Sequence, residues 1–162
     1  MKKLSLIPFI VMSLVASPSW GETLDDLVER DGLYYKKFSD VPFTGEIKTK
    51  EANGWIKDGR KEGYWTEYFS NGQLWHKGDY KNGNREGPWV FYYKTGGLSA
   101  TGKYENGKRE GFWISHNELG GVLMQGEYKN DKKEGRWVYN SPDEGVRKAF
   151  SGVYKDGVKI SD

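Results

Sequence analysis

The side chains that could support acid–base, nucleophilic or metal chemistry are few in this sequence. The chain has two histidines, His76 and His116, and no cysteine, which excludes thiol catalysis, cysteine zinc sites and a disulfide partner. His76 occupies a position that Ala100 and Met124 fill in later copies of a repeat, as expected for an ordinary strand residue. No serine or threonine lies in a nucleophile elbow, and no cluster of His, Asp and Glu has metal-ligand spacing. We therefore expect no enzyme, no metal site and no cofactor.

Four glutamates recur at intervals of 24 residues, each after a basic residue and before a glycine. Such a row, with carboxylates about 10 Å apart, could bind cations or basic partners. The basic neighbours roughly cancel the local field, so we expect each carboxylate to accept hydrogen bonds from turn amides or to pair with a cation. The glutamates are Glu62, Glu86, Glu110 and Glu134, and the basic residues before them are Lys61, Arg85, Arg109 and Lys133.

Exposed aromatic rings are the third kind of side chain with a chemical use, because they stack on sugar rings or enclose quaternary ammonium groups. Trp75 lies on the polar side of its predicted strand, and we expect Trp75 and Tyr93 to be available to a partner. The positions equivalent to Trp75 hold Ser99 and Leu123, so no aromatic ladder forms on that side. The rings favour a binding function, with carbohydrate as one alternative ligand.

A repeat of 24 residues positions these side chains and organises nearly the whole chain. The expected divisions are a signal peptide over 1–21, a cap or linker over 22–31, a degenerate leading repeat over 32–56, full repeats over 57–80, 81–104, 105–128 and 129–154, and a truncated repeat over 155–162. The recurring residues that we expect to be structural are Trp65, Trp89, Trp113 and Trp137, Gly63, Gly87, Gly111 and Gly135, and Tyr80, Tyr104, Tyr128 and Tyr154.

Each repeat predicts a β-hairpin made of an aromatic strand, a turn that contains glycine and a second strand. Asn-Gly pairs at 53–54, 71–72, 82–83 and 106–107 are hairpin signals, and we expect the charged connections between repeats to be the longer ones. Glycines on the packed side of the second strands leave space for rings from neighbouring strands, at Gly78, Gly102, Gly126 and Gly152. Aromatic residues of the first strand differ in parity, so either a bulge intervenes or rings line both faces.

The fold class that follows is all-β, an elongated single-layer antiparallel ribbon of hairpins with a 24-residue period. Leu24 to Arg30 could form one or two helical turns that cap the open end of the ribbon.

The first 21 residues have the composition of an export signal, with two lysines, an apolar run from Leu4 to Val15 and a small-x-small sequence before Glu22. We therefore expect an exported protein, periplasmic rather than extracellular. Two of the 25 Lys and Arg residues lie in this segment and no acidic residue does, so the remaining basic residues balance the 23 Asp and Glu residues. A balanced charge disfavours nucleic acid as a partner.

The recurring order E-G-x-W-x-x-Y, N-G-x-L and G-x-Y-x-N-G-K-x-E-G resembles the MORN-repeat variant of YwqK-like bacterial proteins. The opening DGLYYKKFSDVPFTGEI, over 31–47, is similar to the usual start of that family, and the resemblance covers roughly 31–159. It implies a ribbon of antiparallel hairpins without catalysis and an antitoxin or immunity role, while MORN repeats elsewhere are associated with membrane lipids and protein assembly. Because this chain carries an export signal, a toxin partner would act outside the cytoplasm.

Two functions are therefore expected from the sequence. The first is an exported, non-enzymatic module that binds a protein partner, antitoxin-like or immunity-like as the resemblance implies. The alternative is a cell-envelope module that contacts polysaccharide in the cell wall or lipid headgroups in the membrane. A single-layer ribbon offers no deep pocket, which disfavours an enzyme site for a small molecule.

Overall fold

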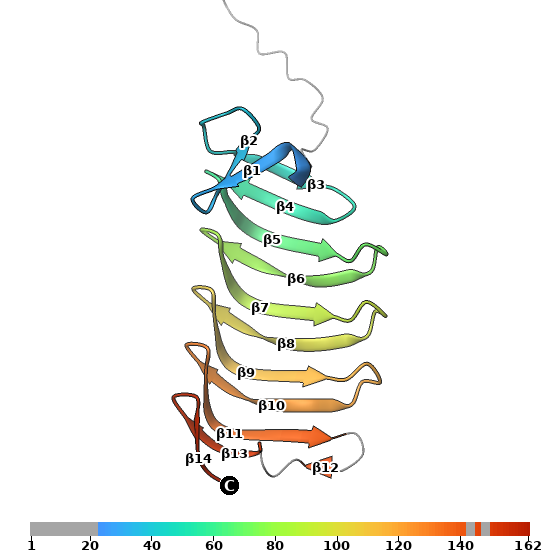
Figure 1. The fold of residues 1–162 in the computed structure, drawn as a ribbon, viewed down its shortest axis with the longest axis vertical. Helices are drawn as coiled ribbons and strands as arrows, with labels where there is room; N and C mark the ends of the chain where they lie inside the picture. The colour runs from blue at the N-terminus through green and yellow to red at the C-terminus, as the bar shows by residue number, and fades with distance from the viewer. Residues whose placement is uncertain (1–22, 142–144, 147–149) are drawn as a thin grey trace, which may run out of the picture.

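The computed structural model describes residues 23–141, 145–146 and 150–162, which form an almost entirely β-stranded molecule. Its main sheet is open and antiparallel, and strands that follow one another in the chain lie side by side from β3 to β11. Figure 1 shows the hairpins stacked along the long axis of the molecule. The predicted all-β ribbon of consecutive hairpins is therefore confirmed.

The strands of the stacked hairpins are eight to ten residues long, whereas those at the two ends are shorter. The elements are η1 (Leu24–Asp26), β1 (Leu27–Arg30), β2 (Leu33–Lys36), β3 (Gly45–Lys48), β4 (Ala52–Lys57), β5 (Arg60–Tyr68), β6 (Leu74–Lys81), β7 (Asn84–Tyr92), β8 (Leu98–Glu105), β9 (Lys108–His116), β10 (Val122–Lys129), β11 (Lys132–Ser141), β12 (Gly145–Val146), β13 (Gly152–Lys155) and β14 (Val158–Ser161).

The charged connections between repeats are the tight ones, which is the reverse of what we expected from the sequence. Asn82 and Gly83 alone join β6 to β7, with φ of 51° and 82°. Positive φ at both central residues defines the two-residue turn that matches the twist of the strands. Glu-Gly and the basic residues that follow this turn belong to β7 instead of lengthening the loop. The Asn71-Gly72 connection is a five-residue loop, and Asn53-Gly54 lies inside β4.

Each first strand contains a bulge at its Glu-Gly pair, which lies before the tryptophan and so leaves the opposite parity of Trp65 and Tyr68 unchanged. Asp79 of β6 faces Glu86 of β7, but the preceding Gly78 faces Trp89, so Gly87 and Pro88 are extra residues on β7. Gly87 has a φ of 66°, in the left-handed region that favours glycine, and Gly63, Gly111 and Gly135 repeat this conformation. The long strands β5, β7, β9 and β11 bend near their starts (Figure 1). Of the two alternatives for this strand, rings on both faces is the one present, because Tyr92 lies on the face opposite Trp89, with the Lys77 ammonium 5.9 Å from its ring centroid.

The N-terminal end differs from the helical cap that the sequence suggested. A single 3-10 turn over Leu24–Asp26 follows Thr23, whose side chain forms a capping box with Asp26. The next residues are strand β1, because Asp31 and Gly32 make a two-residue turn that pairs β1 with β2. Of the predicted leading repeat, only the β3–β4 hairpin therefore joins the main sheet, and β2 pairs with β1 in a separate sheet.

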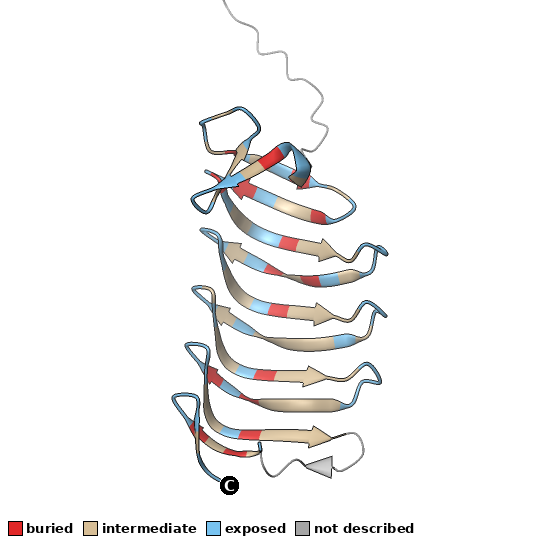
Figure 2. Ribbon diagram, in the orientation of Figure 1, coloured by how far each residue is buried: buried red, intermediate tan, exposed pale blue. Residues whose placement is uncertain are grey.

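The buried residues of the first hairpins form a compact apolar cluster beneath β1, seen in Figure 2 as buried segments on β1, β3, β4 and β5. Its members are Leu27, Phe43, Ile47, Ala52, Ile56 and Trp65. At the other end, β13 and β14 continue the sheet through an Asp156-Gly157 turn. The predicted signal peptide lies outside the described residues, as do 142–144 and 147–149 of the last full repeat. Within the described part of the chain, none of the helical segments could span a membrane.

Candidate binding face

One face of the main sheet carries three parallel rows of side chains, which we call the aromatic face. Its central row alternates tryptophans with the small residues that they cover. Trp89 faces Gly78 on one side and Gly102 on the other. Trp113 lies in the same way between Gly102 and Gly126, and Trp137 between Gly126 and Gly152. A Cβ atom added to Gly78 would overlap the indole of Trp89. The prediction that these glycines leave space for rings is confirmed at Gly78, Gly102 and Gly126, whereas at Gly152 an added Cβ would meet Lys159 and the Ser161 carbonyl.

The indoles are fixed by hydrogen bonds as well as by packing. Trp89 donates from Nε1 to the carbonyl oxygen of Asp79 at 3.1 Å, and the other three tryptophans of the row make the equivalent bond at 2.9 to 3.2 Å. Trp65, Trp89 and Trp137 are each no more than 1% exposed. A single-layer sheet buries them because neighbouring rings and long basic side chains cover them from above. The tryptophan row is therefore the buried core of the stacked hairpins.

The second row alternates basic residues with tyrosines on neighbouring strands. Tyr104 of β8 faces Arg109 of β9, and Tyr80 faces Arg85 in the same way. The Arg109 guanidinium carbon lies 3.9 Å from the ring centroid of Tyr128, and that of Arg85 lies 4.6 Å from Trp89. Such contacts stabilise a cation above the negative face of a ring. The members of this row are Lys61, Tyr80, Arg85, Tyr104, Arg109, Tyr128, Lys133 and Tyr154.

The glutamates that follow these basic residues point elsewhere, because successive residues of a strand alternate in direction. Glu86 accepts a hydrogen bond from the backbone N–H of Asn106, in the turn of the next repeat, at 2.8 Å. The three equivalent bonds join Glu62 to Asn82, Glu110 to Asn130 and Glu134 to Asp156 at 2.7, 2.9 and 3.1 Å. The prediction that each carboxylate accepts a turn amide is confirmed.

The third row contains a gap. Its cross-strand neighbours run in the order Glu67, His76, Phe91, Ala100, Ser115, Met124 and Tyr139. Large side chains fill both ends of this row, but its centre holds Ala100 on β8 and Ser115 on β9. Phe91 and Met124 stand three strands apart, or about 14 Å, with only these two short side chains between them. We call this space the socket.

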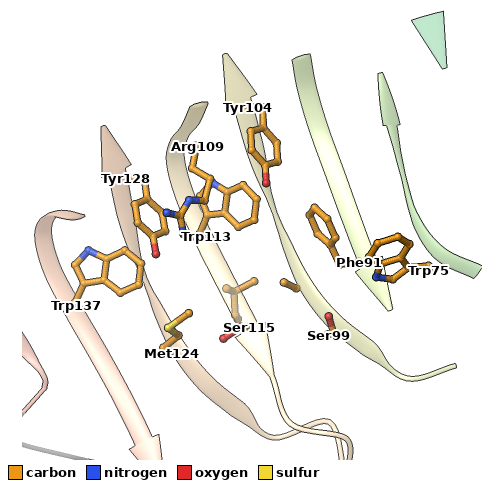
Figure 3. A pocket seen from close by; sticks show the side chains of 12 residues that line it. Trp75, Phe91, Ser99, Tyr104, Arg109, Trp113, Ser115, Met124, Tyr128 and Trp137 are labelled. Carbon is orange, nitrogen blue, oxygen red and sulfur yellow. The ribbon is translucent and has the colours of Figure 1, made fainter. Parts of the chain in front are cut away.

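The socket belongs to an open groove of about 380 Å³. Trp113 and Tyr104 border it on the side of the tryptophan and tyrosine rows, and Arg109 reaches it from the same side. Figure 3 shows the short side chain of Ser115 among the rings of Phe91 and Trp113 and the thioether of Met124. The expectation that the ribbon offers no deep pocket therefore needs refinement, because the aromatic face has a shallow groove large enough for a ring.

The aromatic face as a whole carries more positive than negative charge, and Arg109 brings one positive charge to the groove. Arg109 donates from Nε to Oδ1 of Asp131 at 2.8 Å, and Lys61 pairs with Glu67 at 2.5 Å. Within the described residues, Arg85 and Lys133 have rings beside them but no carboxylate partner. Arg85 instead donates to the hydroxyl of Tyr104 at 3.2 Å. The charge of the face is thus suited to an anionic group.

His76 lies below this surface and is 2% exposed. Its Nε2 is 3.4 Å from Oε2 of Glu67, while its Nδ1 has no hydrogen-bond partner in the described structure. The rings of Trp75, Trp89 and Phe91 surround the imidazole at centroid distances of 4.4, 5.5 and 5.7 Å. Burial lowers the pKa of His76 to about 4, against the attraction of the Glu67 carboxylate. A neutral, enclosed imidazole is the packed strand residue that the repeat predicts.

Trp75 and Tyr93, the two rings that the sequence assigned to a partner, occupy different environments. Trp75 is 44% exposed and borders the groove beyond Phe91. Tyr93 is half-buried in the loop after β7, and its hydroxyl donates to the carbonyl oxygen of His116 at 2.5 Å. The structure thus brings Trp75, but not Tyr93, to the groove. The socket itself was missed from the sequence, although its signal is present: Ala100 and Ser115 occupy repeat positions that hold large side chains in the neighbouring copies.

No family model and no curated protein matches this chain. Among solved structures, accessory secretory protein 1, 2 and 3 of Streptococcus pneumoniae is 16% identical, with a TM-score of 0.36 over 64% of this chain and 20% of that chain. A GtfA/B complex bound to UDP and GlcNAc is 11% identical, with a TM-score of 0.23 over 68% of this chain and 24% of that chain. The chain spans about a fifth to a quarter of the length of these structures. Both TM-scores are below 0.5, so neither likeness bears on function.

Proposed function

We propose that this chain is an exported, non-enzymatic repeat module that binds a protein partner through its aromatic face. The observation that carries the proposal is the socket, because a row filled by large side chains elsewhere is interrupted by Ala100 and Ser115. Fixed backbone and ring walls favour binding, since little conformational freedom is lost when a partner side chain enters. The enclosed His76 is not accessible to a substrate, which supports a binding role over a catalytic one.

The sequence supplies the rest of this proposal. The resemblance to the MORN-repeat variant of YwqK-like proteins favours an antitoxin-like or immunity-like role, in which the partner is a toxin. The export signal predicted over 1–21 places that partner outside the cytoplasm, with the periplasm as the proposed location.

An envelope polysaccharide is the second candidate ligand. The observation in its favour is Trp75, a partly exposed indole at the edge of the groove that could stack on a sugar ring. The pull-down described below separates the two candidates by what is recovered.

The test is a variant that closes the socket with side chains taken from the same repeat positions. Ala100→Met introduces the residue found 24 positions later, and Ser115→Phe the residue found 24 positions earlier. The double variant is expected to gain about 1 kcal/mol in free energy of unfolding, as cavity-filling and consensus changes often do. Thr101→Gln is the matched control. It also introduces the residue found 24 positions later, but on the opposite face of β8.

The tagged chain and both variants are used to recover partners from gently solubilised envelope extract, and urea unfolding is measured in parallel. One stoichiometric protein recovered with the wild type and Thr101→Gln, but not with the more stable double variant, supports the proposal. Equal recovery by the double variant contradicts a role for the socket. Glycan or lipid recovered without a protein supports the envelope alternative.

A further inference from the structure

The chemistry of the groove is specific enough to define the group that it accepts. We propose, building on the proposed protein-binding function, that the socket takes an aromatic side chain of the partner with a carboxylate next to it in the partner sequence. The ring enters between Phe91 and Met124 above Ala100 and Ser115, and the carboxylate binds the guanidinium of Arg109.

The apolar part of the argument rests on the walls of the socket. Phe91 and Trp113 have ring centroids 6.1 Å apart and tilted planes, so together they form an aromatic wall. Met124 forms the opposite wall, and its flexible thioether adapts to the edge of an entering ring. A gap of about 14 Å between Phe91 and Met124 leaves room for one ring in contact with both.

The charged part rests on Arg109, the basic residue that borders the groove. The ring of Tyr128 and the carboxylate of Asp131 fix its guanidinium in place. One guanidinium can bond two carboxylates, since it has five N–H donors in a planar arrangement. Arg85, behind Tyr104, adds a second positive charge without a carboxylate of its own among the described residues. An anionic partner is therefore favoured over a neutral one.

A peptide fits this groove better than a saccharide does. Sugar recognition depends on several hydrogen-bonding side chains around an exposed ring face, whereas apolar and aromatic side chains make up most of this lining. Its polar side chains are those of Ser99, Ser115, Tyr104, Tyr128 and Arg109, and the Tyr104 hydroxyl already accepts a hydrogen bond from Arg85. Apolar walls with a few polar groups at the rim are typical of a pocket that anchors one side chain of a protein partner.

Met124 gives a direct readout for the test. The chain has three methionines, Met1, Met12 and Met124, and Met124 forms a wall of the socket. In the full chain with labelled methionine methyl groups, the Met124 resonance is assigned by its loss in Met124→Leu. The probes are three peptides, acetyl-Gly-Phe-Asp-amide, its Asn counterpart with the carboxylate removed, and its Ala counterpart with the ring removed. Trigalacturonic acid serves as the saccharide arm.

The Phe-Asp peptide is expected to shift the Met124 resonance with a Kd on the order of 1 mM, reasonable for a fragment of this size. The Asn peptide is expected to bind about fivefold more weakly, because charged hydrogen bonds are stronger than neutral ones. The Ala peptide should leave the resonance in place. In Arg109→Gln the preference for Asp over Asn should disappear, whereas Lys133→Gln, at the same repeat position but outside the groove, should retain it.

The proposal is overturned if no peptide shifts the Met124 resonance, if the Ala peptide shifts it as much as the Phe-Asp peptide, or if the Asp preference survives in Arg109→Gln. A shift with trigalacturonic acid alone would overturn it in favour of the saccharide ligand. These outcomes are distinct from failure of the proposed function. If the peptide test fails but the double variant Ala100→Met and Ser115→Phe still loses the protein partner, the proposed function stands. The partner then fills the socket with a different chemical group.

Discussion

His76 shows how a single residue of the repeat acquires an unusual environment. Its position is held by alanine or methionine in other copies, yet here an imidazole fills the row between Glu67 and Phe91. Glu67 also pairs with Lys61, so the carboxylate is shared between the ammonium and the imidazole. Arg85, on the neighbouring strand, adds a positive charge that opposes protonation of the ring. The result is a neutral histidine packed against tryptophan.

This environment predicts a pH dependence of stability. The folded chain holds the pKa of His76 near 4, while the unfolded chain restores it to about 6.5. Between these values the unfolded state binds more protons, so the free energy of unfolding falls as pH falls from 6.5 to 4. At pH 4.5 the loss from this residue is roughly 2–3 kcal/mol relative to pH 7.

The measurement is urea unfolding of the wild type and His76→Met at both pH values. Methionine is the residue that Met124 places at the equivalent position, so the control keeps the row filled without a titratable group. The free energy of unfolding of His76→Met, relative to that of the wild type, should be higher at pH 4.5 than at pH 7. Parallel loss of stability in both would show that other groups cause the effect.

At the scale of the hairpin, each repeat is joined to the next by its Glu-Gly bulge. The bulge turns the glutamate towards the following tight turn and the preceding basic residue towards the aromatic face. Neighbouring residues of one strand thereby perform two separate tasks. One fixes the spacing of the turns, and the other covers the tryptophan row.

Removing one of these carboxylates tests its share of the stability. Glu86→Ala leaves the N–H of Asn106 without its acceptor and is expected to lower the free energy of unfolding by about 1 kcal/mol. Glu86→Gln keeps a side-chain oxygen and should restore part of the loss. Chemical denaturation of the three proteins makes the comparison. If Glu86→Ala unfolds at the wild-type denaturant concentration, the turn bond contributes nothing.

The sequence predicted the hairpins, the tryptophan row and the glycines beneath it, because these depend on residues that recur with a fixed period. It did not predict which connection is tight. Asn82-Gly83 and Asn71-Gly72 are the same dipeptide, and only the strand pairing on either side decides which becomes a two-residue turn. The socket was missed for a related reason. Its floor is formed by Ala100 and Ser115, which become neighbours only through the register of β8 and β9.

At the scale of the whole molecule, the three rows continue from one repeat to the next. We therefore expect that one whole repeat can be removed while the rows on either side of it still align. Removing 81–104 joins Tyr80 to Glu105, which occupies the position of Lys81 one repeat later. The shortened chain is expected to remain soluble and β-stranded, with a lower midpoint of thermal unfolding because fewer hairpins support one another. Circular dichroism and a thermal melt would measure this.

A matched deletion of half a repeat, 81–92, provides the contrast. It removes a single strand, so every later strand would meet its neighbour in the wrong direction, and we expect aggregation. A folded product from this second deletion, or an unfolded one from the first, would show that the 24-residue repeat is not the unit by which the sheet can be shortened.

The stacking direction also determines how the molecule responds to mechanical tension. The first and last strands lie at opposite ends of the long axis (Figure 1), and the strands run across that axis. A force applied between the two ends would load the ladder bonds of one strand pair at a time, as in opening a zipper, and not all of them in parallel. Each 24-residue repeat released in this way would lengthen from about 10 Å to roughly 80 Å. The ribbon would therefore yield stepwise, one hairpin after another, at low force.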